Sequence, residues 1–253
     1  MTNTYIRAYH STSDDYRKAF DCFLAHTDQK TVMRSRLDKV VGELPRRDVF
    51  VDGGAGNGAV TTWYAGDFAK TIAVEPNASL RAELARQCPQ ATVIDGTITS
   101  AAIEPVADLV LCSHVFYYIP SDAWLENLER MVSWLAPGGV LVCALQNHGT
   151  DCMRMLDYFY GRHYNLSKLT DQFRRGAGSR YNVRLETLPA TINTDTLEDA
   201  YTIAEFMLNL VDLENDPQKP TRAGLEEYVR RYFQNVAGRF SFTCDQDFLM
   251  IRS

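Results

Sequence analysis

The residues best able to do chemistry cluster around a glycine-rich turn. Residues 49–58 read VFVDGGAGNG, so Asp52 ends an apolar run and Gly54, Gly56 and Gly58 follow at alternating positions. Glycines spaced in this way let the backbone turn sharply and approach a ligand. Dinucleotide sites usually carry Gly-x-Gly-x-x-Gly beneath a pyrophosphate. Here the third glycine comes one residue early, and a carboxylate at Asp52 would repel a pyrophosphate but suit an ammonium group.

Two further acids end the next two apolar runs. Glu75, before Pro76, can accept both hydroxyls of a ribose, as a two-oxygen acceptor does well. Asp95, before Gly96, can accept from the amino group of an adenine, and a simple turn-starting Asp is the alternative. Ammonium, ribose and adenine together describe S-adenosylmethionine. The residues predicted to hold it are Asp52, Gly53, Gly54, Gly56, Glu75, Pro76, Asp95, Gly96 and Ser113.

A histidine and two tyrosines follow the next apolar run, in the segment SHVFYY at 113–118. Aromatic faces attract cations, which suits both a sulfonium and an amine. His114, with an ordinary pKa near 6.5, is mostly neutral at pH 7 and could orient a substrate or accept a proton, or it could be structural. One of the two tyrosines is expected to support the next helix from within the core. The predicted catalytic residues are His114, Tyr117 and Tyr118.

These residues need a framework of alternating strands and helices. The expected strands are 48–53, 71–75, 91–95, 108–112 and 140–145, and the expected helices between them are 59–64, 78–87 and 121–135. Continuous runs of Val, Ile and Leu suit parallel strands that are covered on both faces. The alternation predicts an α/β fold with a doubly wound, mostly parallel sheet, whose fifth strand follows a Pro137-Gly138-Gly139 turn.

Helical segments flank this framework. A capping pattern at 11–14 precedes an amphipathic helix that carries Tyr16, Phe20 and Phe23 on one face. Further helices are expected at 195–210 and 221–233, a strand at 240–251, a surface linker at 215–220 and a mobile loop at 174–179. We expect one domain over 1–253, with a helical lid at 1–45, a cofactor-binding core at 46–146 and substrate-side helices and final strands at 147–253.

The segment 48–146 resembles the class I S-adenosylmethionine-dependent methyltransferases, whose first motif is an apolar strand, an acid and Gly-x-Gly-x-Gly. This resemblance implies a seven-stranded sheet. A narrower resemblance, to the histamine N-methyltransferase group, spans nearly the whole chain. It rests on the segments 20–27 (FDCFLAHT), 53–56 (GGAG), 74–76 (VEP), 117–118 (YY) and 248–251 (FLMI).

The narrower resemblance also implies where a substrate would bind. In that group an acid at the end of the leading helix meets the substrate's ammonium group, and this position falls on Gln29, beside Asp28. An amide before the last strand corresponds to the segment 243–246, at Cys244. An amide also stands where this chain has His114. The polar anchors are therefore changed, which argues for a substrate other than histamine. The predicted substrate-binding residues are Tyr9, Asp28, Gln29, His114, Tyr117 and Cys244.

The leading hypothesis is a methyltransferase that acts on a small-molecule amine or another nitrogen nucleophile, by in-line transfer without a metal. Three alternatives stay open. They are an O-methyltransferase of secondary metabolism, a nicotinamide-dependent oxidoreductase, and a non-catalytic module that binds S-adenosylmethionine. The first ten residues are expected to gate the site through Tyr5 and Tyr9, so deleting them should lower methyl transfer far more than thermal stability.

Composition limits the classes of partner. The 253 residues include 26 Lys and Arg against 32 Asp and Glu, and 45% are hydrophobic. A chain of this kind forms a conventional core, and its acidic balance without a basic run disfavours nucleic acid. The six cysteines form no CxxC pair, the histidines form no pair at metal-ligand spacing, and no apolar run approaches a membrane span. We therefore expect a reduced, cytoplasmic protein without metal or membrane partners, a monomer or weak homodimer.

Overall fold

The computed structural model describes residues 4–10, 13–104, 106–211 and 219–253. Two compact units make up the chain, and each consists of three segments. The first unit comprises Met1–Ser35, Gln146–Tyr164 and Thr187–Gln246, and the second comprises Arg36–Leu145, Asn165–Glu186 and Asp247–Ser253. Ser11 of the predicted capping pattern and most of the predicted linker at 215–220 lie outside the described residues.

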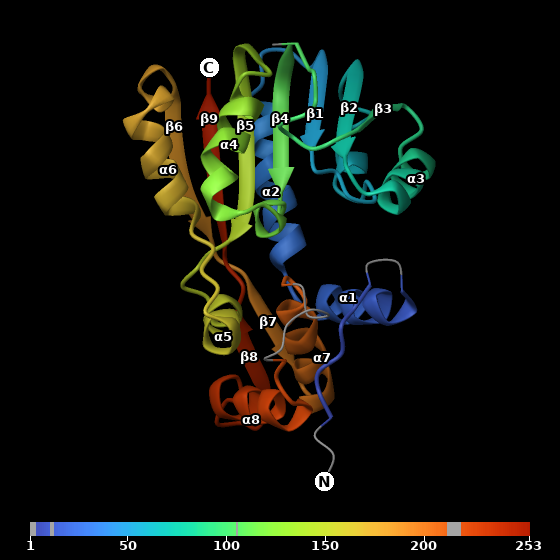
Figure 1. Ribbon diagram of the computed structural model, residues 1–253, viewed down its shortest axis with the longest axis vertical. Coiled ribbons are helices and arrows are strands. Elements are labelled where there is room, and N and C mark those ends of the chain that lie inside the picture. Colours follow the sequence, from blue (N-terminus) through green and yellow to red (C-terminus); the bar gives the residue numbers. More distant parts are fainter. Residues whose placement is uncertain (1–3, 11–12, 105, 212–218) are drawn as a thin grey trace. The chain divides into compact units, whose positions relative to one another are not determined.

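A seven-stranded sheet dominates the second unit, in the order β3-β2-β1-β4-β5-β9-β6 (Figure 1). Its strands are β1 (Val49–Gly53), β2 (Lys70–Glu75), β3 (Ala91–Asp95), β4 (Ala107–Ser113), β5 (Leu135–Gln146), β6 (Asn182–Leu188) and β9 (Gln246–Arg252). The pairs β3–β2, β2–β1, β1–β4 and β4–β5 are parallel. In Figure 1 the arrow of β9 points opposite to that of β4. The predicted doubly wound, mostly parallel sheet is confirmed.

The chain order of the strands determines where a ligand can bind. From β1 the chain builds β2 and β3 on one side, then crosses to β4 and β5 on the other. Ligands of open α/β sheets bind beyond the carboxyl ends of the strands at such a reversal. The predicted cofactor residues follow the carboxyl ends of β1, β2, β3 and β4, so the topology brings them to this one edge.

Helices cover the sheet because its central strands β1, β2, β4 and β5 are buried along most of their length. The helices here are α2 (Gln29–Gly42), α3 (Ala78–Gln87), α4 (Trp124–Val132) and α6 (Leu166–Arg175), with short 3-10 turns η1 (Thr61–Trp63), η2 (Phe116–Tyr118), η3 (Ser121–Ala123) and η4 (Ala177–Arg180). Figure 1 shows α4 and α6 in front of the sheet and α2 behind it. Asn77 caps α3, because its Oδ1 accepts from the backbone N–H groups of Ser79 and Leu80.

The first unit combines helices with a small antiparallel sheet. Its elements are α1 (Asp14–His26), α5 (Asp151–Tyr160), α7 (Leu197–Leu208), α8 (Arg222–Tyr232), β7 (Thr191–Thr194) and β8 (Phe240–Thr243). Ser13 caps α1 by accepting from the N–H of Tyr16. The predicted apolar face of α1 packs on α7, where Phe206 lies within 6 Å of the rings of Tyr16, Phe20 and Phe23.

Four expected elements are corrected. The predicted helix at 59–64 is only the short turn η1, because the β-branched Thr61 turns its hydroxyl to Asp52. The predicted 137–139 turn is a bulge within β5, where the pairing with β4 skips from Leu135 to Val140.

The other two corrections concern the C-terminal half. The predicted mobile loop at 174–179 instead ends α6 and forms η4, with Gly178 packed against Phe173. The predicted strand at 240–251 is two strands, β8 and β9, in different sheets. The strand is interrupted between β8 and β9, where Cys244 donates its N–H to Ala190 and Asp245 accepts from the N–H of the same residue.

Candidate active site

The glycine turn after β1 is built so that side chains cannot fill it. Gly54 and Gly58 have φ of +84° and +90°, in the region that favours glycine. A Cβ on Gly54 would come within 2.5 Å of the Val115 side chain, and one on Gly58 within 2.7 Å of Leu84. The N–H groups of Gly54 and Ala55 both donate to the carbonyl of Val74 on β2. The turn therefore rests on β2 and on the segment after β4.

Glu75, at the end of β2, holds this turn from the other side. Its side chain is buried, with Oε2 accepting from the N–H of Gly56 at 2.9 Å and Oε1 accepting from the N–H of Asn77 at 2.8 Å. A carboxylate has about four acceptor positions, so it can accept further bonds from two hydroxyl groups. Glu75 thus organises the loop in addition to its predicted contact with a ribose.

Asp52 is a buried acid at the end of β1. Its Oδ2 accepts from the hydroxyl of Thr61 at 2.6 Å, and its relative exposure is 2%. The pKa of Asp52 is raised to about 7, mainly by burial and in smaller part by the charge of Glu75, against the lowering effect of the Thr61 hydrogen bond. An ammonium group would favour the ionised form of this acid. The site therefore fits the amino end of S-adenosylmethionine, as the sequence predicts.

Asp95, at the end of β3, is exposed and paired. Its Oδ2 accepts from Arg81 Nη2 at 2.9 Å, and Arg81 Nη1 donates to the carbonyl oxygens of Glu75 and Pro76. A Cβ on the neighbouring Gly96 would lie 2.7 Å from the Ser100 hydroxyl, which would have to move to make room for it. Sequence reasoning missed Arg81, although a basic residue one turn into the following helix is visible in the sequence.

His114 follows β4 in an unusual backbone conformation. Its φ of +59° is the one positive value at a non-glycine residue in the described part of the chain. Such a conformation is costly for an ordinary residue, and His, Asn and Asp adopt it most readily. The N–H of His114 donates to Ala144 on β5, and Nδ1 lies 3.4 Å from the Tyr117 hydroxyl. The two rings stack at 20° with centroids 6.0 Å apart.

The two tyrosines after His114 differ in burial, and the sequence predicts that one of them lies in the core. Tyr117 is buried and Tyr118 has a relative exposure of 69%. Ser113, at the end of β4, is half-buried before His114. Because Val115 packs against Gly54, this whole segment lies beside the glycine turn. The second unit thus gathers every predicted cofactor residue and the three predicted catalytic residues at one edge of the sheet.

Three of the predicted substrate residues meet in the first unit. Gln29 is buried and donates its side-chain amide to the carbonyl of Cys244 at 3.0 Å, while Asp28 accepts from the N–H of Thr191. Burial raises the pKa of the Cys244 thiol to about 12, so the thiol stays neutral. Beside Gln29, burial lowers the pKa of Lys30 to about 8. The resemblance to the histamine N-methyltransferase group predicted Asp28, Gln29 and Cys244 as substrate-binding residues, but nothing in the sequence analysis indicated Lys30.

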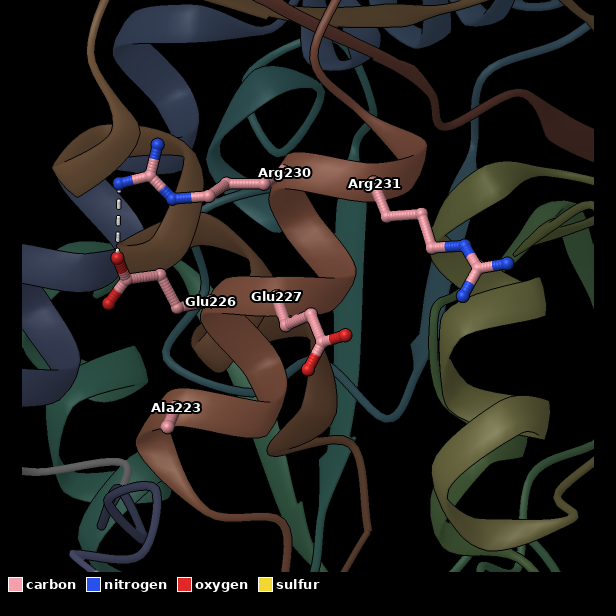
Figure 2. A pocket seen from close by; sticks show the side chains of 5 residues that line it. All are labelled: Ala223, Glu226, Glu227, Arg230 and Arg231. Carbon is pink, nitrogen blue, oxygen red and sulfur yellow. Dashed lines mark hydrogen bonds and ion pairs between the residues drawn. The ribbon is translucent and has the colours of Figure 1, made fainter.

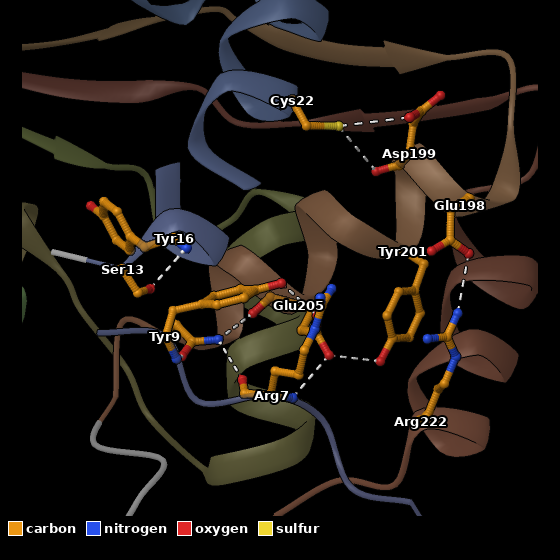
Figure 3. A network of polar contacts seen from close by, with 11 residues as sticks. Arg7, Tyr9, Ser13, Tyr16, Cys22, Glu198, Asp199, Tyr201, Glu205 and Arg222 are labelled. Carbon is orange, nitrogen blue, oxygen red and sulfur yellow. Dashed lines mark hydrogen bonds and ion pairs between the residues drawn. The ribbon is translucent and has the colours of Figure 1, made fainter. Parts of the chain in front are cut away.

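Tyr9, another of the predicted substrate-binding residues, belongs to a polar network on α7 (Figure 3). Glu205 is 1% exposed and accepts from the Tyr9 hydroxyl at 2.6 Å, the Tyr201 hydroxyl at 2.9 Å, and both the backbone and the guanidinium of Arg7. Burial, together with the Glu205 charge, raises the pKa of Tyr9. The described segment before α1 is therefore docked on α7. Gating of the site through Tyr9, as expected from the sequence, would require Tyr9 to move, which conflicts with these contacts.

An open depression on α8 carries no comparable chemistry. It is lined by Ala223, Glu226, Glu227, Arg230 and Arg231 on the outward face of the helix (Figure 2). Glu226 and Arg230 form an ion pair one turn apart, which is typical of a solvated helix face. None of the predicted site residues lines it.

Two further searches cover only the described residues. No group of three or more His, Cys, Asp or Glu side chains there could hold a metal ion. No described helix combines the length and the apolar character needed to cross a membrane. All six cysteines are free thiols.

Comparisons with known proteins agree with this geometry. Solved structures with similar folds include the YcgJ protein of Bacillus subtilis, with a TM-score of 0.60, 12% identity, and coverage of 86% of this chain and 97% of that one. The N-methyltransferase NodS of Bradyrhizobium japonicum has a TM-score of 0.53 and 13% identity, with coverage of 89% of this chain and 98% of that one. A phosphoethanolamine N-methyltransferase of Haemonchus contortus, solved with S-adenosylhomocysteine, has a TM-score of 0.55 and 15% identity. The match covers 87% of this chain and 52% of that one.

Sequence comparison gives the family itself. No curated protein matches the chain. The family model described as "Methyltransferase domain" matches residues 24–190, which include the glycine turn and all four strand ends that carry the cofactor residues. The chain therefore belongs to this methyltransferase-domain family and is a class I methyltransferase that uses S-adenosylmethionine.

Proposed function

We propose that this protein methylates a small-molecule amine or another nitrogen nucleophile. The observation that carries the proposal is His114, an imidazole held in a costly backbone conformation beside the glycine turn and within reach of the Tyr117 hydroxyl. Strained residues concentrate at functional sites. The fold alone does not explain the strain, because a glycine at this position would relieve it.

When bound, the cofactor supplies an electrophilic methyl group on a sulfonium. Asp52 would hold the amino group, Glu75 the ribose and Asp95 the adenine. An amine attacks only when its lone pair is free, and it must give up a proton before or after the transfer. His114 accepts that proton on its imidazole. Tyr117 orients the ring by stacking on it and by facing Nδ1 with its hydroxyl.

Two structurally similar proteins are named as N-methyltransferases, which supports a nitrogen acceptor, as does the sequence resemblance to the histamine N-methyltransferase group. An O-methyltransferase is the second candidate, and the same histidine favours it, since a hydroxyl needs a base more than an amine does. We expect the changed anchors at Gln29 and Cys244 to select a substrate other than histamine. The protein is expected to act in the cytoplasm, as a monomer or weak homodimer.

A labelled-methyl screen tests the proposal. Small-metabolite extracts and a panel of amines and alcohols are incubated with the enzyme and methyl-labelled cofactor, and the labelled product is identified. Glu75→Ala serves as the inactive control. A labelled N-methyl product supports the proposal. A labelled methyl ether that His114→Asn no longer forms would instead show that the protein is an O-methyltransferase. Tight cofactor binding without any labelled product would indicate a binding module instead.

A further inference from the structure

We propose that Arg81 is a positioning residue that lets the enzyme select adenine in its cofactor, by holding Asp95 in the orientation that accepts the adenine amino group. This proposal rests on the adenine contact assigned above to Asp95. It goes further, because it assigns the nucleobase selectivity to a guanidinium that need not touch the cofactor.

The Arg81 guanidinium joins the ends of two neighbouring strands. Glu75 and Asp95 are partners in the pairing of β2 with β3. Nη1 donates to the carbonyl oxygens of Glu75 at 3.1 Å and Pro76 at 2.6 Å, while Nη2 donates to Asp95 Oδ2 at 2.9 Å. Three hydrogen-bond partners fix one guanidinium more firmly than a single ion pair would.

The pairing leaves half of the Asp95 carboxylate available. In the described part of the chain, the contacts of Asp95 with Arg81 involve Oδ2 alone, and the Asp95 side chain is 73% exposed while that of Arg81 is 19% exposed. An exposed Asp normally samples several rotamers, and a ligand must bear the cost of ordering it. Arg81 orders the carboxylate before the ligand arrives, and Oδ1 remains free to accept.

The location of Arg81 supports a role beyond folding. It lies at the end of the first turn of α3, where the helix dipole disfavours a positive charge. Arg86, by contrast, lies in the last turn of the same helix and is exposed. At this unfavourable end of the helix, the ion pair of Arg81 with an exposed acid contributes little stability by itself. It contributes more if it shapes a recognition site.

The ligand chemistry gives a direct readout. A 6-amino group donates to a carboxylate, whereas the 6-oxo group of hypoxanthine presents an acceptor to it, so an ordered Asp95 should reject the inosine analogue. Calorimetry would measure the Kd of S-adenosylhomocysteine and of S-inosylhomocysteine for the wild type, Arg81→Lys, Asp95→Ala and the double variant. Arg86→Lys is the matched control, and melting temperature confirms folding.

We expect Arg81→Lys to lower the preference for the adenosine form about tenfold, the size of one charge-assisted hydrogen bond. Asp95→Ala should lower it at least as much, and the double variant should lose no more than Asp95→Ala alone. An equal loss of affinity for both analogues in Arg81→Lys would mean a merely structural arginine. Unchanged preference in Asp95→Ala would place the adenine elsewhere, and neither result would touch the assignment as a methyltransferase, which the labelled-methyl screen tests separately.

Discussion

The carboxylate of Glu75 accepts backbone hydrogen bonds from two turns at once, so its replacement has two consequences. Glu75→Ala removes the charge-assisted contacts predicted for the ribose, each contributing about 1.5 to 3 kcal/mol. It also frees the N–H of Gly56, which loosens the glycine turn. We expect S-adenosylhomocysteine affinity, measured by calorimetry, to fall at least a hundredfold. Glu129→Ala, an exposed change on α4, is the control, and unchanged affinity in Glu75→Ala would show that the ribose binds elsewhere.

His114 permits a substitution that separates activity from stability. His114→Gly removes the imidazole and the cost of φ at +59°, which is about 1 kcal/mol for an ordinary residue. We expect the melting temperature to stay level or rise while kcat falls at least tenfold. His114→Asn, which tolerates the same φ, should also lose kcat. Full activity in the glycine variant would make His114 structural.

Asp52 gives the free protein a distinctive pH dependence. Its pKa is raised to about 7, above the ordinary value of 3.8, so the folded state holds a proton that the unfolded state has lost. Folding stability therefore falls as pH rises from about 4 to 7, by about 4 kcal/mol from this group. Cofactor affinity changes in the opposite direction, because the ammonium group needs the ionised acid.

The difference between wild type and Asp52→Asn isolates this group from other titrating residues. Urea unfolding at pH 5 and pH 8 should show the wild type losing stability relative to the variant as pH rises. Calorimetry of S-adenosylhomocysteine in buffers of different ionisation enthalpy should show proton release near pH 6 in the wild type and none in the variant. The same pH profile in both proteins would contradict the raised pKa.

At the level of elements, the sequence predicts best where periodicity and burial agree. The strands β1 to β4 and the helix α3 fall within a residue of their expected bounds, because continuous apolar runs and capping residues determine them locally. The predictions at 59–64 and 240–251 failed because long-range partners decide those segments. The Thr61 hydroxyl donates a hydrogen bond to Asp52, and the N–H of Cys244 donates one to the carbonyl of Ala190. No local pattern records such pairings.

The same distinction applies to the site. Acids and glycines at strand ends follow from motif and topology, so Asp52, Glu75 and the glycine turn could be found from the sequence. The positive φ of His114, the Arg81 bridge and the Glu205 network depend on tertiary contacts. Only the three-dimensional structure reveals them.

The docked N-terminal segment changes one sequence-based expectation. Deleting residues 1–10 would leave the buried Glu205 without Arg7 and Tyr9, so we expect the deletion to reduce stability as well as activity. Glu205→Gln tests the contact itself, with an expected loss of roughly 3 kcal/mol in urea unfolding, since several donors lose a charged acceptor. Glu198→Gln, an exposed change on the same helix, should cost under about 1 kcal/mol. Equal effects of the two substitutions would mean that the network does not anchor the segment.

At the scale of the whole molecule, the two units are expected to unfold together. The chain passes between them five times, and four regular elements, α2, β5, β6 and β9, contain residues of both. Unfolding one unit alone would therefore end helices and strands in mid-course, which removes their remaining hydrogen bonds. This favours one cooperative transition over two.

The tryptophans make that expectation testable. Trp63, Trp124 and Trp134 all lie in the second unit, so their fluorescence reports on that unit, whereas circular dichroism also reports on the helices of the first. Urea curves from the two signals should coincide. S-adenosylhomocysteine at a hundred times its Kd should raise the free energy of unfolding obtained from each signal by about 2.7 kcal/mol, because a ligand stabilises every part that unfolds together with its site. If the ligand shifts the fluorescence curve alone, the first unit folds independently, and the protein has two domains rather than the single one expected.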